Sequence, residues 1–452
     1  MKLLEEYNDF FKKAEREELI NELKKYIRLL GINEIISSSF DLEKVLKEVL
    51  YQGSKLTEAD IASIFLINKE ENVLEFAATT DPNHEKLEKI KVPMGKGISG
   101  YVAETGKIVN TADVQNDARF YKNVDHITGE TTKSYLCVPL KVRDEIIGTA
   151  QLMNKKNNCE FTEDDIRISR AFASQAAIAI ERVLLHNEAV IREKMEKELK
   201  VAANIQQQLL PQKNPQIDGY SIAGISIPAK EVGGDYFNYI VHQKNNETEY
   251  VDFTVADVSG KGIPAALIVS NFHACLNLLL PLYENLGDLA YHLNNYMKKN
   301  LIMGNFITFF LMRLEIKTGG VTYINCGHNP PYYFLLADNK KEIKTFQRSG
   351  PVLGLIDDVK YKVFETTLSK GDMIIPFSDG VEEAHNEKNE LFGEDRILES
   401  AHECYQKASA KKLSDNEFSK YIVEQMIKTV DEYRGEAEVN DDTTLEVIYR
   451  YP

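Results

Sequence analysis

The sequence predicts an α+β protein with more than one domain, and three observations support this fold class. The chain has 452 residues, more than one domain of roughly 150 residues would hold. Strand-like runs occur in two groups, one before residue 155 and one after residue 220. Between them, residues 164–210 keep apolar positions at helical spacing, with no break before Pro211. Strands that mostly follow strands, with helices grouped between them, favour a layered mixed fold over a doubly wound one.

Composition and charge indicate a soluble protein. Hydrophobic residues make up 43% and charged residues 27%, and 54 Lys and Arg against 70 Asp and Glu give a net charge of −16. A surface of this sign repels phosphate backbones, so we expect no nucleic-acid partner. The five cysteines are odd in number and form no CxxC pair, which predicts reduced thiols. No apolar run is long enough for a signal peptide or a membrane span, so we expect a cytoplasmic protein with no membrane partner.

The first part of the chain reads as helices followed by strands. Apolar positions at helical spacing predict an N-terminal helical segment over residues 1–31. The tripeptide Arg143-Asp144-Glu145 separates two strand-like runs and predicts a hairpin. The further elements expected here are a helix over Leu42–Leu50 and strands over Ile61–Asn68, Val73–Thr79, Tyr135–Val142 and Ile146–Met153.

The long helical stretch continues into a predicted linker over residues 186–212. Leu184 and Ile191 are seven residues apart, and Met195, Ala202 and Leu209 repeat that spacing. A seven-residue apolar repeat is typical of a coiled-coil seam, so we expect a homodimer. A single amphipathic helix packed on its own domain fits the spacing equally well.

After Pro211 the chain becomes a succession of strands with helices between them, and we assign residues 213–452 to a second domain. The expected strands are Ile222–Ile227, Tyr250–Val255, Phe306–Leu314, Val321–Ile324, Met373–Phe377 and Leu445–Tyr449, and the expected helices are Ile263–Leu280, Leu286–Leu301, Arg396–Gln406 and Asn416–Val430.

Four aspartates in this second part stand at strand ends, beside glycine or another acid. They are Asp235 in EVGGDYFN, Asp257 in VADVSGKG, Asp379 in FSDG and Asp441 in NDDTTLEV. Carboxylates gathered at one sheet edge would repel each other unless they are protonated or neutralised by a cation. Oxygen ligands suit Mg²⁺ or Mn²⁺, and two such ions can activate water for attack on phosphorus. Any one of these aspartates alone is also typical of a solvated turn.

Together these segments resemble the metal-dependent (PPM-type) serine/threonine protein phosphatases, in the bacterial branch that includes SpoIIE and RsbU. The resemblance covers residues 190–450 in nine blocks, namely AANIQQQLLP, EVGGDYF, DVSGKGIPAAL, NFITFFLMRL, NCGHNPPYYF, GPVLG, GDMIIPFSDGVEEA, LFGEDR and DDTTLEV. It implies a β-sandwich flanked by helices that binds two divalent cations, Mn²⁺ or Mg²⁺.

The same resemblance implies a role for each site residue. Asp257, Asp379 and Asp441 would be metal ligands together with the Val258 carbonyl, and Asp235 would hold metal-bound water. All four aspartates would be catalytic. The phosphate-binding Arg of the eukaryotic relatives has no counterpart here, and only Lys230 and Lys261 could replace it.

The first half resembles a GAF sensor domain over residues 32–185. The resemblance lies in ADIASIFLIN, VPMGKGISGYVAETGKIVNTADV and SYLCVPL…IIGTAQLMNK. Asn154, Lys155, Phe161 and Asp165 resemble the NK…F…D(E) motif of cyclic-nucleotide-binding GAF domains, with Ile166 in place of the final Glu. These four residues are therefore the candidate ligand site. Alternatively the motif is an ion pair that braces the fold, in a GAF domain that only dimerises.

The two resemblances together imply a signal-regulated phosphatase. Its reaction would be hydrolysis of phosphoserine or phosphothreonine on a regulatory protein, and its branch implies a STAS-type anti-sigma-factor antagonist as the substrate. The alternative is a non-catalytic scaffold that binds a signalling partner or a cyclic nucleotide.

Overall fold

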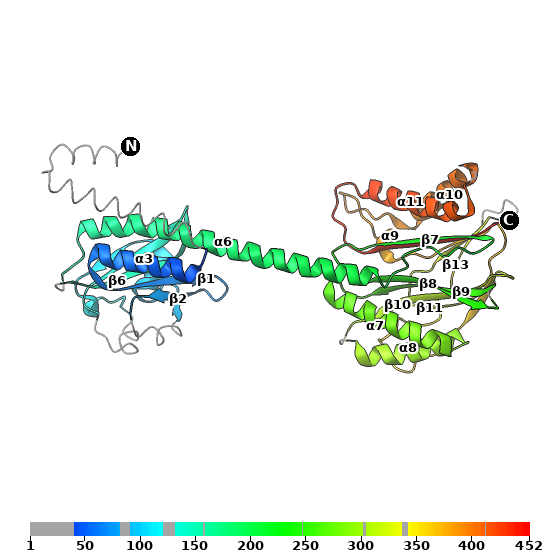
Figure 1. The fold of residues 1–452 in the computed structure, drawn as a ribbon, viewed down its shortest axis with the longest axis horizontal. Helices are drawn as coiled ribbons and strands as arrows, with labels where there is room; N and C mark the ends of the chain where they lie inside the picture. The colour runs from blue at the N-terminus through cyan, green and yellow to red at the C-terminus, as the bar shows by residue number, and fades with distance from the viewer. Residues whose placement is uncertain are drawn as a thin grey trace. The chain divides into compact units, whose positions relative to one another are not determined.

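A computed structural model describes residues 40–81, 91–120, 132–156, 159–245, 247–301, 304–336, 342–411 and 413–452. The N-terminal helical segment expected over residues 1–31 lies outside the described residues. The chain forms two compact units, Met1–Lys194 and Met195–Pro452 (Figure 1).

The first unit is an antiparallel sheet with the strand order β3-β2-β1-β6-β5-β4, covered on one face by helices α3 and α6. Apolar side chains of α3 and of the first half of α6 form one core with the central strands. The predicted hairpin is confirmed, because β5 pairs with β6 and Arg143 in the turn has φ 54°. The described elements are α3 (Leu42–Thr57), β1 (Ala59–Asn68), β2 (Val73–Thr79), β3 (Lys91–Pro93), α4 (Gly97–Thr105), β4 (Val109–Thr111), η2 (Val114–Asn116), β5 (Tyr135–Val142), β6 (Glu145–Lys155) and α6 (Glu163–Gln207).

Helix α6 is continuous over 45 residues, as its unbroken helical spacing predicted. Its first half buries one stripe, which ends at Ile180 and Val183. From Leu184 onward the large apolar side chains are exposed, because no strand or helix of the first unit covers them. They are Leu184, Leu185, Val190, Ile191, Met195, Val201 and Ile205.

The second unit is a sandwich of two five-stranded sheets, with the orders β14-β11-β10-β9-β8 and β13-β12-β15-β16-β7. Helices α7 and α8 cover the outer face of the first sheet, and α10 and α11 cover that of the second (Figure 1). Side chains of both sheets fill the space between them. The predicted β-sandwich flanked by helices is therefore confirmed. The strands are β7 (Tyr220–Ile227), β8 (Asp235–Lys244), β9 (Glu247–Val258), β10 (Ile307–Glu315), β11 (Gly320–Cys326), β12 (Tyr332–Leu335), β13 (Glu342–Thr345), β14 (Phe364–Thr367), β15 (Met373–Ile375) and β16 (Thr443–Arg450), and the helices are α7 (Ile263–Leu279), η4 (Leu280–Leu282), α8 (Leu286–Asn300), α9 (Asp379–Glu382), α10 (Gly393–Lys411) and α11 (Asp415–Arg434).

Helix α7 with η4, Ile263–Leu282, is long and apolar enough to cross a membrane by length and composition. Val269, Phe272 and Leu276 on this helix are fully buried against the sheet. These contacts are those of a core helix.

Candidate active site

The end of β9 places Asp257 at the edge of the space between the two sheets. Val251 and Phe253 point into that space, and Asp257 continues their alternating row. Asp235, the first residue of β8, lies directly opposite Asp257 in the register of the two strands. Asp379 begins α9 just after β15, and Asp441 comes just before β16. The two sheets thus bring all four predicted acids to one end of the sandwich.

Asp235 is the most deeply buried of the four, with 5% of its surface exposed. Thr444 Oγ1 on β16 donates a hydrogen bond of 2.6 Å to its Oδ2. This bond fixes the orientation of the Asp235 carboxyl group from the opposite sheet.

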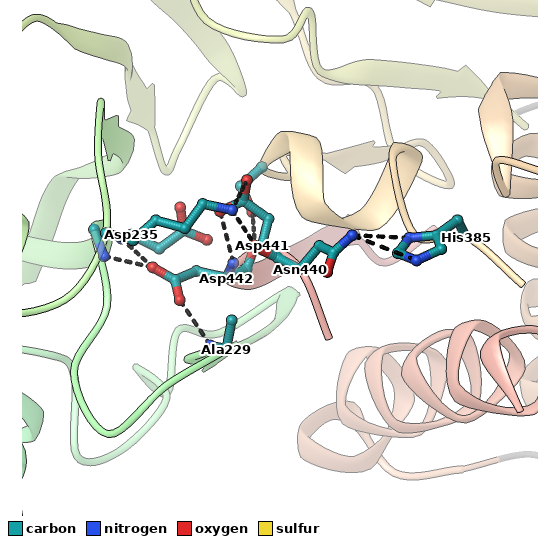
Figure 2. Close-up of polar contacts among 9 residues, drawn as sticks. Ala229, Asp235, His385, Asn440, Asp441 and Asp442 are labelled. Atoms are coloured by element: carbon teal, nitrogen blue, oxygen red, sulfur yellow. Dashed lines mark hydrogen bonds and ion pairs between the residues drawn. The ribbon is translucent and has the colours of Figure 1, made fainter. Parts of the chain in front are cut away.

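Asp442 is the residue of the site whose role the sequence did not indicate. Its Oδ1 accepts the Ala229 N–H at 2.7 Å, and its Oδ2 accepts the N–H groups of Gly234 and Asp235 (Figure 2). A Cβ on Gly233 would lie 2.6 Å from Asp442 Oδ2, which explains why glycine stands there. Asp442 therefore anchors the loop that positions Asp235.

The turn that carries Asp379 is attached to β16 in a similar way. Ser378 Oγ accepts the Thr444 N–H at 2.9 Å and contacts the Asp442 carbonyl oxygen at 3.3 Å. A Cβ on Gly380 would lie 2.0 Å from that same carbonyl oxygen. Only glycine lets the two segments approach this closely, so Gly380 helps to set the position of Asp379.

The carboxyl groups of the four aspartates together carry more negative charge than the neighbouring cationic side chains neutralise. Burial, and then repulsion by Asp379 and Asp441, raises the pKa of Asp257 to about 7. Burial and Asp441 raise the pKa of Asp379 to about 6. Burial and Asp257 hold the pKa of Asp235 well above its usual range. A bound divalent cation would reverse these shifts, since it favours the charged carboxylates.

The donor atoms fit a hard divalent cation, because all of them are oxygens. Within the described ranges, however, no three acidic, histidine or cysteine side chains already stand close enough to hold one ion. The cluster therefore supplies the charge and the donor atoms, and rotation of side chains must supply the final ligand geometry.

The two candidate phosphate-binding lysines differ in their surroundings. Lys261 Nζ lies 2.9 Å from Asp441 Oδ2 and also donates to the Asn440 carbonyl oxygen. Lys230 is exposed, and no ion pair of its side chain occurs in the described part of the chain. The structure thus brings Lys261, and not Lys230, into contact with the acid cluster.

The C-terminal end of α6 contacts the loop before Asp235. Gln206 Nε2 donates to the Gly233 carbonyl oxygen at 2.6 Å, and Gln206 Oε1 accepts the Gly233 N–H at 3.0 Å. The block AANIQQQLLP includes Gln206 but does not by itself indicate this contact. It joins the linker helix to the loop that Asp442 anchors.

A hollow of about 190 Å³ opens beside Asp441. Its walls include Glu383, His385, Arg434 and Asn440, and Asn440 Nδ2 lies 3.4 Å from His385 Nε2 (Figure 2). The hollow therefore lies next to the acid cluster and has polar and charged walls.

In the first unit, three of the four candidate ligand residues contact one another. Lys155 forms an ion pair with Asp165, and its Nζ lies 5.7 Å from the centre of the Phe161 ring. Asp165 also accepts the Thr162 N–H at 2.7 Å. Asn154 Oδ1 accepts the Lys133 N–H at 2.8 Å. These contacts fit the alternative in which the motif braces the fold.

Comparison with known proteins agrees with this geometry. The family described as Stage II sporulation protein E (SpoIIE) matches residues 247–451, and the GAF domain family matches residues 41–180. Phosphoserine phosphatase RsbU of Bacillus subtilis (strain 168) is 34% identical over 262 residues, which are 58% of this chain and 72% of RsbU.

Two further similarities each cover part of the chain. Dual 3',5'-cyclic-AMP and -GMP phosphodiesterase 11A of Takifugu rubripes is 39% identical over 160 residues, 33% of this chain and only 18% of that enzyme. The solved SiaA-PP2C domain of Pseudomonas aeruginosa has a TM-score of 0.48 and 19% identity, covering 58% of this chain and all of that domain.

The SpoIIE family match includes the segments that carry Asp257, Asp379 and Asp441, and the match to RsbU extends over 72% of that phosphatase. Enzymes of this PPM type need divalent cations, in keeping with the oxygen donors gathered here. The chain therefore belongs to the RsbU family of protein phosphatases, with a SpoIIE-type catalytic domain that follows a GAF domain.

Proposed function

We propose that this phosphatase removes phosphate from phosphoserine or phosphothreonine on a regulatory protein, with two Mn²⁺ or Mg²⁺ ions and under the control of its GAF domain. The observation that carries the proposal is the convergence of Asp235, Asp257, Asp379 and Asp441 at one end of the sandwich. A non-catalytic scaffold would have no need for four buried or half-buried carboxyl groups that repel each other.

Each residue then has a defined task. Asp257, Asp379 and Asp441, with the Val258 carbonyl oxygen, would hold the ions. When bound, these ions lower the pKa of water and stabilise the charge on a phosphoryl group. Asp235, oriented by Thr444, would place the attacking water. That water forms the new bond to phosphorus as the bond from phosphorus to the seryl oxygen breaks.

A STAS-type anti-sigma-factor antagonist is the proposed substrate. The relationship to RsbU supports this class of substrate, and the hollow with polar and charged walls lies beside Asp441, next to the acid cluster. A phosphoserine on a folded protein can reach the acid cluster only if the residues around the phosphoserine dock next to the cluster.

We expect the purified full chain with Mn²⁺ to release phosphate from a phosphorylated STAS domain at least tenfold faster than from an unrelated phosphoprotein. A preference of that size corresponds to about 1.4 kcal/mol in the transition state. Phosphate release is followed with a colorimetric assay, with Asp379→Asn as the inactive control. Equal rates on both proteins would contradict the substrate assignment but not the phosphatase activity.

Control by the GAF domain is proposed to act through α6. The double hydrogen bond of Gln206 to Gly233 supports this route, since a shift of the helix end would move the loop that holds Asp235. A small molecule such as a cyclic nucleotide is the proposed GAF ligand, on the strength of the Asn154, Lys155, Phe161 and Asp165 motif and the similarity to phosphodiesterase 11A. We infer that the protein acts in the cytoplasm.

We also propose a homodimer joined along α6. The exposed row that includes Leu184, Ile191 and Met195 supports a seam between two copies, because exposed apolar side chains in a row are unfavourable in water. Sedimentation of the full chain at micromolar concentration should give a dimer, and Ile191→Glu should give a monomer. A wild-type monomer at that concentration would contradict the proposed seam.

A further inference from the structure

Both carboxylate oxygens of Asp441 already have partners within the protein. Oδ1 accepts the Asp442 N–H at 3.0 Å, and Oδ2 lies 2.9 Å from Lys261 Nζ. The same ammonium group donates to the Asn440 carbonyl oxygen. A cation that binds Asp441 must therefore displace Lys261 from Oδ2 or share this oxygen with it.

The loop between β9 and α7 presents Lys261 to the cluster. The flanking residues Gly260 and Gly262 have φ of +98° and +74°, a region that other residues rarely adopt. A Cβ on either glycine would meet no atom within 4 Å, so the two glycines serve the backbone conformation and not close packing. The loop conformation thus carries a lysine from just beyond Asp257 to Asp441, 180 residues away in the sequence.

The charge of Lys261 acts on more than one carboxyl group. It favours the ionised forms of both Asp257 and Asp379, against the larger effects of burial and mutual repulsion. Half of the Lys261 side chain remains exposed, with 46% of its surface in contact with solvent. The ammonium group can therefore leave Asp441 for water or for another anion without crossing a packed core.

We propose that Lys261 is an internal counter-ion that competes with a divalent cation for Asp441 and so weakens cation binding. This inference depends on the proposed role of Asp441 as a metal ligand. A cation near Asp441 also repels the ammonium group, so the two positive charges exclude each other. Once displaced, Lys261 remains on its loop beside the site, where its ammonium can pair with the phosphate of a substrate. Lys261 would thus pair first with the Asp441 carboxylate and later with the phosphate of the substrate.

The test is Mn²⁺ binding to the full chain, measured by calorimetry and independently by the electron paramagnetic resonance signal of free Mn²⁺. Lys261→Met should bind Mn²⁺ about three- to tenfold more tightly than the wild type, because it removes both a competitor and a like charge. Lys261→Arg keeps the charge and should stay within about twofold of the wild type. Lys244→Met, an exposed lysine at the end of β8 opposite to Asp235, controls for the change in net charge.

Two outcomes separate this inference from the proposed function. Unchanged or weaker Mn²⁺ binding by Lys261→Met, with binding lost in Asp441→Asn, would overturn the role of Lys261 alone. Mn²⁺ binding that survives in Asp441→Asn would overturn the ligand role of Asp441 itself. At saturating Mn²⁺, Lys261→Met should also raise KM for a phosphorylated substrate. Circular dichroism confirms that each variant is folded.

Discussion

Replacing Asp379 with asparagine is expected to lower phosphatase activity by at least about 10³-fold, because it removes a charged ligand from the centre of the cluster. The side chain keeps its size, and the Ser378–Thr444 contact that positions the turn is untouched. The loss of activity should therefore appear as a lower kcat of a variant that is still folded. Initial rates on a phosphoprotein with saturating Mn²⁺ check this. Asp218→Asn, an exposed aspartate in the same unit, serves as the control and should keep its activity.

The same substitution should raise thermal stability in a chelator. The pKa of Asp379 is raised to about 6 in the folded protein, from an ordinary value of 3.8. A raised carboxyl pKa means that the ionised group opposes folding, by an amount that grows as the pH rises from about 4 to 6 and is constant above. Asn cannot ionise, so the melting temperature of the variant should exceed that of the wild type by a few degrees at pH 7.5.

Melting curves at pH 4 and pH 7.5 distinguish this effect from a general change in packing. The difference between variant and wild type should nearly vanish at pH 4, where both side chains are neutral. A variant that is less stable than the wild type at pH 7.5 in the chelator would contradict the charge excess at the site.

Removal of divalent cations is the second change with a large expected effect. An excess of chelator should abolish activity, and Mn²⁺ or Mg²⁺ should restore it, since oxygen donors prefer these ions. Zn²⁺ should restore it poorly, because no cysteine or histidine belongs to the proposed ligand set. Activity is measured after dialysis against chelator and addition of each ion in turn. Full activity in excess chelator would contradict a metal-dependent reaction.

The resemblance to the phosphatases predicted the four acids, and the strands before two of them indicate where they lie. The alternation of Val251 and Phe253 puts Asp257 on the inner face of its sheet, and the position of Asp379 follows from the strand before it. The long α6 helix was also predicted from the sequence, since no residue within it interrupts the helical spacing of apolar positions.

The contacts that position the acids could not be predicted, since they join residues far apart in the chain. Asp442 reaches Ala229 across 213 positions, and Lys261 reaches Asp441 across 180. Of two adjacent aspartates, the sequence alone does not show which one anchors the Gly233–Gly234 loop. That choice depends on how β16 pairs with β7 in one sheet and on how this sheet packs against the sheet that carries Asp235.

The most direct test of the account is the position of bound manganese in crystals grown with Mn²⁺, read from anomalous scattering at the manganese edge. We expect two peaks within the cluster, bounded by the carboxylates of Asp257, Asp379 and Asp441 and the Val258 carbonyl oxygen. Both peaks should disappear or weaken strongly in Asp379→Asn. Manganese bound only outside this cluster in the active wild-type protein would contradict the assignment of these residues as the catalytic metal site.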